Sequence, residues 1–111
     1  MTTIGELMTL ERILLEINVR FKFTFSYGDA YKLYTYLKDI GRMTNLYFQL
    51  LDEFYTKYHD KDELEKYKNR LSGGDVEFNT DDIKTFIDSV FDTVDDQDFK
   101  NIVLKNRFWK N

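Results

Sequence analysis

The chain has 111 residues, a length that suits one domain with a single core, so we expect one domain over 1–111. It contains no cysteine, which excludes disulfides and thiolate chemistry, and its formal net charge of −4 disfavours direct nucleic-acid binding. No apolar run approaches the roughly 20 residues that cross a bilayer, so we expect a cytoplasmic protein with no membrane contact.

The composition favours helices with short connections. The chain has no proline and only 5 glycines, so few residues force a helix to break. Aromatic residues are abundant, with 10 Phe, 8 Tyr and 1 Trp, and such side chains bury large areas when they pack. We expect some of these rings to remain available for contacts with a partner.

A helix followed by a strand is predicted at the start of the chain. Thr3 and Glu6 have the spacing of a capping box, and apolar residues at helical spacing predict a helix over about 4–15. Residues 17–25 then alternate strictly between apolar and polar, which predicts a half-buried strand. The alternation extends back into the helical segment, so the boundary between the two elements stays open.

The next predicted helix covers Tyr27 to Ile40. Ser26 and Asp29 resemble a capping box at its start, and Gly41 is suited to stop it. Its apolar stripe indicates one face packed on the core.

Two more helices are predicted in the middle of the chain. Thr44 is suited to cap an amphipathic helix that runs to Tyr58. A charged helix follows Asp60 and ends at Ser72-Gly73-Gly74. Whether these two helices are continuous stays open.

The last third of the chain completes the predicted fold. Residues 75–79 alternate and are the segment available to pair with the strand at 17–25. Thr80 is expected to cap a helix over about 81–94, and a final helix follows Asp96. The fold class is therefore α+β and mostly α, with four to six helices packed around a small two-stranded antiparallel β element.

The inventory of catalytic groups is poor. The single histidine, His59, lies in a charged segment that predicts an exposed turn. Gly73-Gly74 lacks the spacing of a phosphate-binding loop, and 92–98 lacks the ligand spacing and glycine of a calcium loop. We expect no enzyme, no cofactor and no metal.

Acidic residues dominate one segment. Nine acidic residues against one Lys occur between Asp75 and Asp98. The candidate partner-binding carboxylates there are Asp81, Asp88, Asp92, Asp95 and Asp96. Asp88, Asp92 and Asp95 have the spacing of one helical face. They form either a solvated face or a docking surface for a basic partner, such as a nucleic-acid-binding host protein whose phosphate ligand they imitate.

Aromatic residues supply further candidate contacts. Tyr27, Tyr31 and Tyr34 share a helical face turned away from the core stripe. They are covered by the first helix or by the C-terminal segment, or they contact a partner. Trp109, between basic residues at the end of the chain, is either folded back or offered as an anchor. The unpaired edge of the strand at 17–25 favours a homodimer.

A resemblance adds to this interpretation. The order Leu50-Leu51-Asp52-Glu53-Phe54, then Lys57-Tyr58, then Gly74-Asp75-Val76-Glu77-Phe78 and a helix with Ile83, Phe86 and Ile87 resembles small uncharacterised phage proteins of low-GC Gram-positive hosts. The resemblance covers about 27–94 and implies a phage-encoded accessory protein that docks on a host or phage protein and acts by steric occupation. The alternative is a structural or assembly protein of a virion that acts through self-association.

Overall fold

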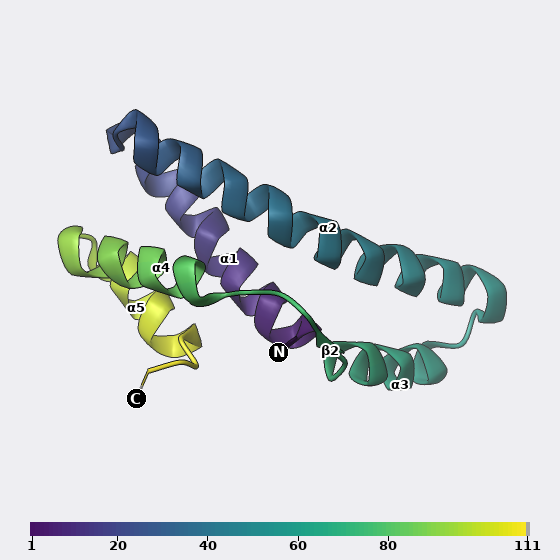
Figure 1. Cartoon of the computed structure of the whole chain (residues 1–111). Coiled ribbons are helices and arrows are strands. Elements are labelled where there is room, and N and C mark those ends of the chain that lie inside the picture. The colour runs from purple at the N-terminus through teal and green to yellow at the C-terminus, as the bar shows by residue number, and fades with distance from the viewer. Residues whose placement is uncertain (111) are drawn as a thin grey trace.

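The computed structural model describes residues 1–110 and shows a mostly helical α+β chain, so the expected fold class is confirmed (Figure 1). Its order is β1 (Thr2–Thr3), α1 (Ile4–Phe21), the 3-10 turn η1 (Lys22–Thr24), α2 (Tyr27–Tyr58), α3 (Lys61–Ser72), β2 (Asp75–Val76), α4 (Asp81–Thr93) and α5 (Gln97–Asn106). None of the helices in this part of the chain is long and apolar enough to cross a membrane.

The strand predicted over 17–25 is wrong, because this segment continues α1 and then forms η1. The capping box of Thr3 and Glu6 starts α1 as expected. The apolar residues of the alternating run separate in the structure: Ile17 is fully buried, whereas Val19 is 79% exposed. Ile17 and Phe21 are four residues apart and therefore also fit one helical face, and packing of that face onto the core decides in favour of the helix.

The stop predicted at Gly41 is also wrong, because α2 is one helix of 32 residues. A single glycine inside a helix costs only about 1 kcal/mol, and α2 has buried residues both before Gly41 and after it, Ile40 and Thr44 among them. Ile40 is fully buried, and the Thr44 hydroxyl lies 3.0 Å from Glu11 Oε2 of α1 and 3.3 Å from Ile40 O, so it does not cap a new helix. The helix ends at His59, whose left-handed conformation (φ 51°) lets its N–H donate to Tyr55 O.

The small sheet contains one of the two expected segments, but this segment pairs with a different partner. β2 pairs antiparallel with β1, with Thr2 opposite Val76. The predicted strand at 75–79 is thus shortened, and its partner is the N-terminus of the chain. The pairing brings the start of α1 against the end of α3, where a Cβ on Gly5 would lie 3.2 Å from Ser72 O. The question left open about the third and fourth predicted helices is decided: α2 ends at Tyr58, and α3 begins separately at Lys61.

The last two helices are confirmed, with one change of cap. Thr80 makes no capping hydrogen bond, and Asn79 Oδ1 instead accepts from the Asp81 N–H at 3.0 Å. Asp96 caps α5 by accepting from the Phe99 N–H at 2.9 Å. In both helices, a nearby side-chain oxygen therefore accepts a hydrogen bond from one of the first backbone N–H groups.

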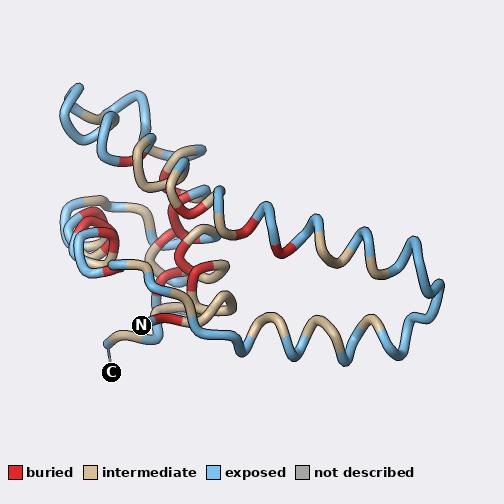
Figure 2. The backbone as a smooth tube through the Cα atoms, turned by 45° about the vertical axis from the view of Figure 1, so that its right-hand side comes forward, coloured by how far each residue is buried: buried red, intermediate tan, exposed pale blue. Residues whose placement is uncertain are grey.

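The core surrounds α1, which α2 and the pair α4 and α5 cover from different sides (Figures 1 and 2). Its fully buried side chains include Leu7, Leu10, Ile13, Leu14, Ile17, Ile40, Ile87, Phe99 and Val103. Within the described chain, α2 has no buried residue after Tyr47, and α3 has none at all. We call residues 48–72 the arm; it projects from the body as two helices without a buried core (Figure 2).

Candidate functional site

The single histidine is placed away from any enclosed site. His59 is exposed at the end of α2, as expected, and it packs against the Tyr55 ring with centroids 5.7 Å apart. The left-handed backbone there serves to end the helix, so the structure accounts for this residue without catalysis.

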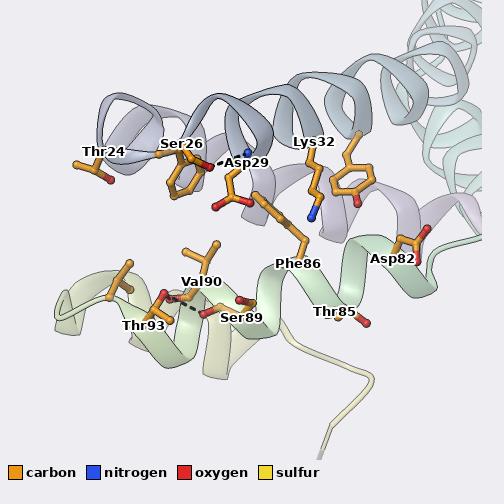
Figure 3. A pocket seen from close by; sticks show the side chains of 13 residues that line it. Thr24, Ser26, Asp29, Lys32, Asp82, Thr85, Phe86, Ser89, Val90 and Thr93 are labelled. Atoms are coloured by element: carbon orange, nitrogen blue, oxygen red, sulfur yellow. Dashed lines mark hydrogen bonds between the residues drawn. The ribbon is translucent and has the colours of Figure 1, made fainter.

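A cleft lies between the start of α2 and α4 (Figure 3). It has a volume of about 680 Å³, and hydroxyl groups line both of its walls. The hydroxyls belong to Thr24, Ser26, Tyr36, Thr85, Ser89 and Thr93. Several of them serve the backbone: Ser26 Oγ accepts from the Asp29 N–H, and Thr93 Oγ1 donates to Ser89 O.

The cleft does not assemble a nucleophile with a base. Burial, together with the negative charge of Asp82, raises the pKa of the Tyr36 hydroxyl, which therefore stays protonated at neutral pH. Among the hydrogen bonds of residues 1–110, none joins a hydroxyl of this cleft to a carboxylate. The same residues contain no cluster of three His, Cys, Asp or Glu side chains able to hold a metal ion. The cleft thus offers polar contacts, and Asp29, Lys32 and Asp82 add charged side chains to its lining.

Asp88, the first residue of the predicted acidic stripe, is bonded within the chain. Its two carboxylate oxygens accept from Arg107 Nη1 at 2.8 Å and from the Trp109 indole N–H at 3.0 Å. Lys110 Nζ lies 3.6 Å from the same carboxylate. Three groups of the C-terminal segment therefore neutralise and cover this side chain.

Asp96 is engaged as well. It accepts from the Phe99 N–H as the cap of α5, and Arg20 Nη1 lies 3.3 Å from its Oδ2. The Phe99 N–H and the Arg20 guanidinium hold the pKa of Asp96 below its ordinary value, because both favour the charged carboxylate. This carboxylate organises the start of α5.

Three predicted carboxylates remain in solvent. Asp81 and Asp92 are exposed on α4, and Asp95 is exposed in the connection beyond Thr93, the last residue of that helix. Asp95 therefore does not continue the helical face that the spacing predicts. The acidic hypothesis rests on these three side chains.

The C-terminal segment folds back onto the domain, which the sequence left open. Trp109 is half-buried and packs against the core, and its indole N–H is bonded to Asp88. The Arg107 guanidinium lies 4.7 Å from the centre of the Phe91 ring. Trp109 thus packs on the domain, and its indole N–H is bonded within the chain.

The three predicted tyrosines are uncovered. Tyr27, Tyr31 and Tyr34 are 87%, 61% and 66% exposed, and neither α1 nor the C-terminal segment shields them. Side chains of this size and exposure on one helical face are typical of contact surfaces.

The sequence interpretation missed that this aromatic surface runs the whole length of α2. Phe48 and Tyr55 are 53% and 36% exposed, and they continue a seven-residue spacing that starts at Tyr27. We define the aromatic stripe as Tyr27, Tyr34, Gly41, Phe48 and Tyr55. The spacing is legible in the sequence, but the helix end predicted at Gly41 divided it into two unrelated halves.

An apolar hollow borders the stripe. Asn18, Lys22 and Phe23 line one side of it, and Ala30, Leu33, Tyr34 and Leu37 of α2 line the other. Phe23 is 93% exposed, with Lys22 Nζ 5.1 Å from its ring centre. The hollow and the stripe together form a continuous apolar surface with a cation at its edge.

Comparison with known proteins adds no relative to this geometry. The chain matches no protein-family model, no curated protein and no solved structure. Its function must therefore be inferred from the surfaces described above.

Proposed function

We propose that this chain is a non-catalytic protein-binding module, encoded by a phage or mobile element, that acts by occupying a partner's surface with the aromatic stripe of α2 and the neighbouring hollow. The observation that carries the proposal is the exposure of Tyr27, Tyr34 and Phe48, which recur at intervals of seven residues along one helix. Large aromatic side chains on a rigid helix supply contact area at low entropic cost.

A steric mechanism fits the chemistry of the surface. The stripe presents rings and aliphatic groups, and the adjoining hollow adds Lys22 as the charged group at its edge. Apolar contacts of this kind exclude water from a partner without forming or breaking covalent bonds. Helix-in-groove recognition and helix pairing both use such a face.

The acidic surface is the less favoured docking site. Asp88 and Asp96 are bonded within the chain, so the field they present to a basic partner is reduced. The exposed residues Asp81, Asp92 and Asp95 lie on two segments and do not line one helical face.

A second candidate function, assembly through self-association, is favoured by the shape of the molecule. The Cα radius of gyration is 15.6 Å, against about 13 Å for a compact domain of this length. The arm accounts for this elongation, and its two helices have no buried core of their own. Apolar surface on such an arm is satisfied when another protein packs against it.

Capture from an extract of Gram-positive cells tests the function with matched variants. The double variant Tyr27→Ala, Tyr34→Ala removes two exposed rings of the stripe, and the triple variant Asp81→Asn, Asp92→Asn, Asp95→Asn removes exposed charges. We expect the tyrosine variant to lose most of the captured protein at both low and high salt, and the aspartate variant to retain it, because apolar contacts are not screened.

The opposite pattern contradicts the proposal. Capture that disappears in the aspartate variant or at high salt, and persists in the tyrosine variant, assigns binding to the acidic surface. Helical circular dichroism of each variant verifies that folding is unchanged.

A further inference from the structure

We infer that the aromatic stripe binds a second copy of this chain, with the two α2 helices antiparallel and a two-fold axis at Gly41. The inference rests on the proposed function, because it names the partner of the same surface. Four observations carry it: the symmetry of the stripe, the unpaired area of the chain, the fit of the arm to the hollow, and the placement of charge.

The stripe is symmetric about Gly41. Tyr34 and Phe48 lie seven residues to either side of the glycine, and Tyr27 and Tyr55 lie fourteen to either side. In a two-fold dimer, a residue on one side of the axis contacts the residue at the same distance on the other side in its partner. Antiparallel α2 helices therefore place Tyr34 against Phe48 of the second copy and Tyr27 against Tyr55, so every ring of the stripe meets a ring.

Gly41 is suited to the axis itself. An added Cβ there would have no atom within 4 Å, so no part of its own chain uses the space beside it. Two glycines that face each other let helix backbones approach closely, and the rings on either side then interlock. The five positions extend over about 42 Å of helix, nearly the 47 Å length of the molecule. Their strict seven-residue repeat is the spacing of helices that supercoil together.

The exposed area of the chain matches what a dimer covers. The accessible surface is 7456 Å². A compact monomer of 13.4 kDa exposes about 6,500 Å², which leaves an excess of about 1,000 Å². A specific interface of standard size buries about 800 Å² on each partner. One further copy therefore suffices to bring the surface to that of a compact protein.

The arm of one copy fits the body of the other. The register carries Phe48 to Tyr34, where Ala30 and Leu37 line the apolar hollow with Phe23. This ring thus enters a pocket at the start of α2 that is open in the single chain. In return, the arm, which lacks a buried residue after Tyr47, gains a body to pack against. By symmetry, each copy fills the hollow of the other and packs its own arm against the other's body.

Charges fall in compatible places. The same register carries Asp52 of the arm to Ala30 of the second copy, beside Lys22 in the hollow. It also places Lys38 opposite Thr44 and Tyr31 opposite Leu51, so Lys38 meets no like charge across the axis. An alternative parallel pairing stacks Lys38 on Lys38 and Asp52 on Asp52, which is unfavourable. The antiparallel arrangement is therefore the one that the charges support.

Cysteine cross-linking tests the geometry directly, because the chain has no cysteine of its own. The variant Gly41→Cys should form a disulfide dimer on mild oxidation, since both thiols lie at the axis. Tyr27→Cys should not cross-link to itself, because its two copies lie about 42 Å apart along the helices. A mixture of Tyr27→Cys and Tyr55→Cys chains should form the mixed dimer. Self-cross-linking of Tyr27→Cys would overturn the antiparallel arrangement.

Light scattering behind size exclusion, over a series of concentrations, tests the association itself. The native chain should have twice the 13.4 kDa mass, and Tyr34→Glu or Phe48→Lys alone should reduce it to the monomer. The combined variant should recover the dimer, because the new charges attract across the two copies. They lie about 21 Å apart within one chain, so recovery cannot come from a contact inside the monomer.

The outcomes separate this inference from the proposed function. A native chain that is monomeric at every concentration overturns the dimer, and loss of a captured protein on Tyr34→Glu then leaves the stripe as a docking surface for another protein. A chain in which Tyr34→Glu and Phe48→Lys change neither mass nor capture overturns both. Helical circular dichroism verifies that each variant folds.

Discussion

Asp88 holds the C-terminal segment against α4, because each of its two carboxylate oxygens accepts a hydrogen bond from that segment. Its side chain is 18% exposed and that of Arg107 is 12% exposed, so both charges are largely removed from water. A charge-assisted hydrogen bond in such a place is stronger than one at the surface, and removal of one partner leaves the other without compensation. The role of Asp88 is therefore to order the residues that follow α5.

We predict that Asp88→Ala lowers the free energy of unfolding by about 1–3 kcal/mol, because Arg107 and the Trp109 indole lose their acceptor. Urea denaturation followed by tryptophan fluorescence measures both the stability and the environment of that indole. Asp92→Ala is the matched control, since it makes the same change on the exposed side of α4 and should alter stability by less than about 0.5 kcal/mol. Equal effects of the two substitutions would contradict this role.

At the scale of elements, α2 determines the shape and the surface of the protein. Its first half packs on α1, and its second half leaves the body and forms the arm with α3. Because the helix is not interrupted at Gly41, the rings before and after the glycine stay in a fixed relation. A break at that position would have separated them into two unrelated patches.

Gly41 gives a prediction about this helix. We expect Gly41→Ala to raise the stability of the monomer by about 0.5–1 kcal/mol, because alanine restricts the unfolded chain and its Cβ meets no neighbour. Urea denaturation at a concentration where the chain is monomeric measures the change. Gly5→Ala is the control inside α1, where the Cβ would press on Ser72 O at 3.2 Å and should cancel the gain. A loss of stability at Gly41 would show that the glycine is required within the monomer.

The whole molecule divides into a body with a core and an arm without one. The side chains of α1 that face the body are fully buried, whereas the arm holds its helices together through half-buried contacts such as the stacked rings of Phe54 and Tyr67, 4.6 Å apart. Two helices alone bury little area, so the arm depends on the body through β2, the start of α1 and the continuity of α2.

We predict that hydrogen exchange reflects this division. Amides of the arm should exchange about tenfold or more faster than amides of α1, a difference of about 1.4 kcal/mol or more in the free energy of local opening. Deuterium uptake resolved by peptide mass spectrometry measures both regions in one sample. A dilution series is the internal control, because self-association should slow exchange in the arm as concentration rises. Uniform protection across the chain at low concentration would contradict the division.

Local interactions made several features of the fold predictable from the sequence alone. The mostly helical class follows from the absence of proline and the apolar spacing, and the helix starts at Thr3, Ser26, Asp60 and Asp96 follow from side chains that accept N–H groups two or three residues away. Such contacts are complete within one turn of the chain. They do not depend on what the helix later packs against.

Tertiary packing decided the features that the sequence left ambiguous. Residues 17–25 fit both a strand and a helix, and burial of Ile17 and Phe21 against Phe99 and its neighbours selects the helix. Gly41 permits a helix end, but the buried residues before and after it, such as Ile40 and Thr44, keep the helix continuous. The carboxylate of Asp88 accepts hydrogen bonds from residues about 20 positions away in the chain, and no local sequence pattern predicts contacts at that distance. These outcomes depend on burial in three dimensions, because the free energy of packing exceeds the weak local preferences that compete with it.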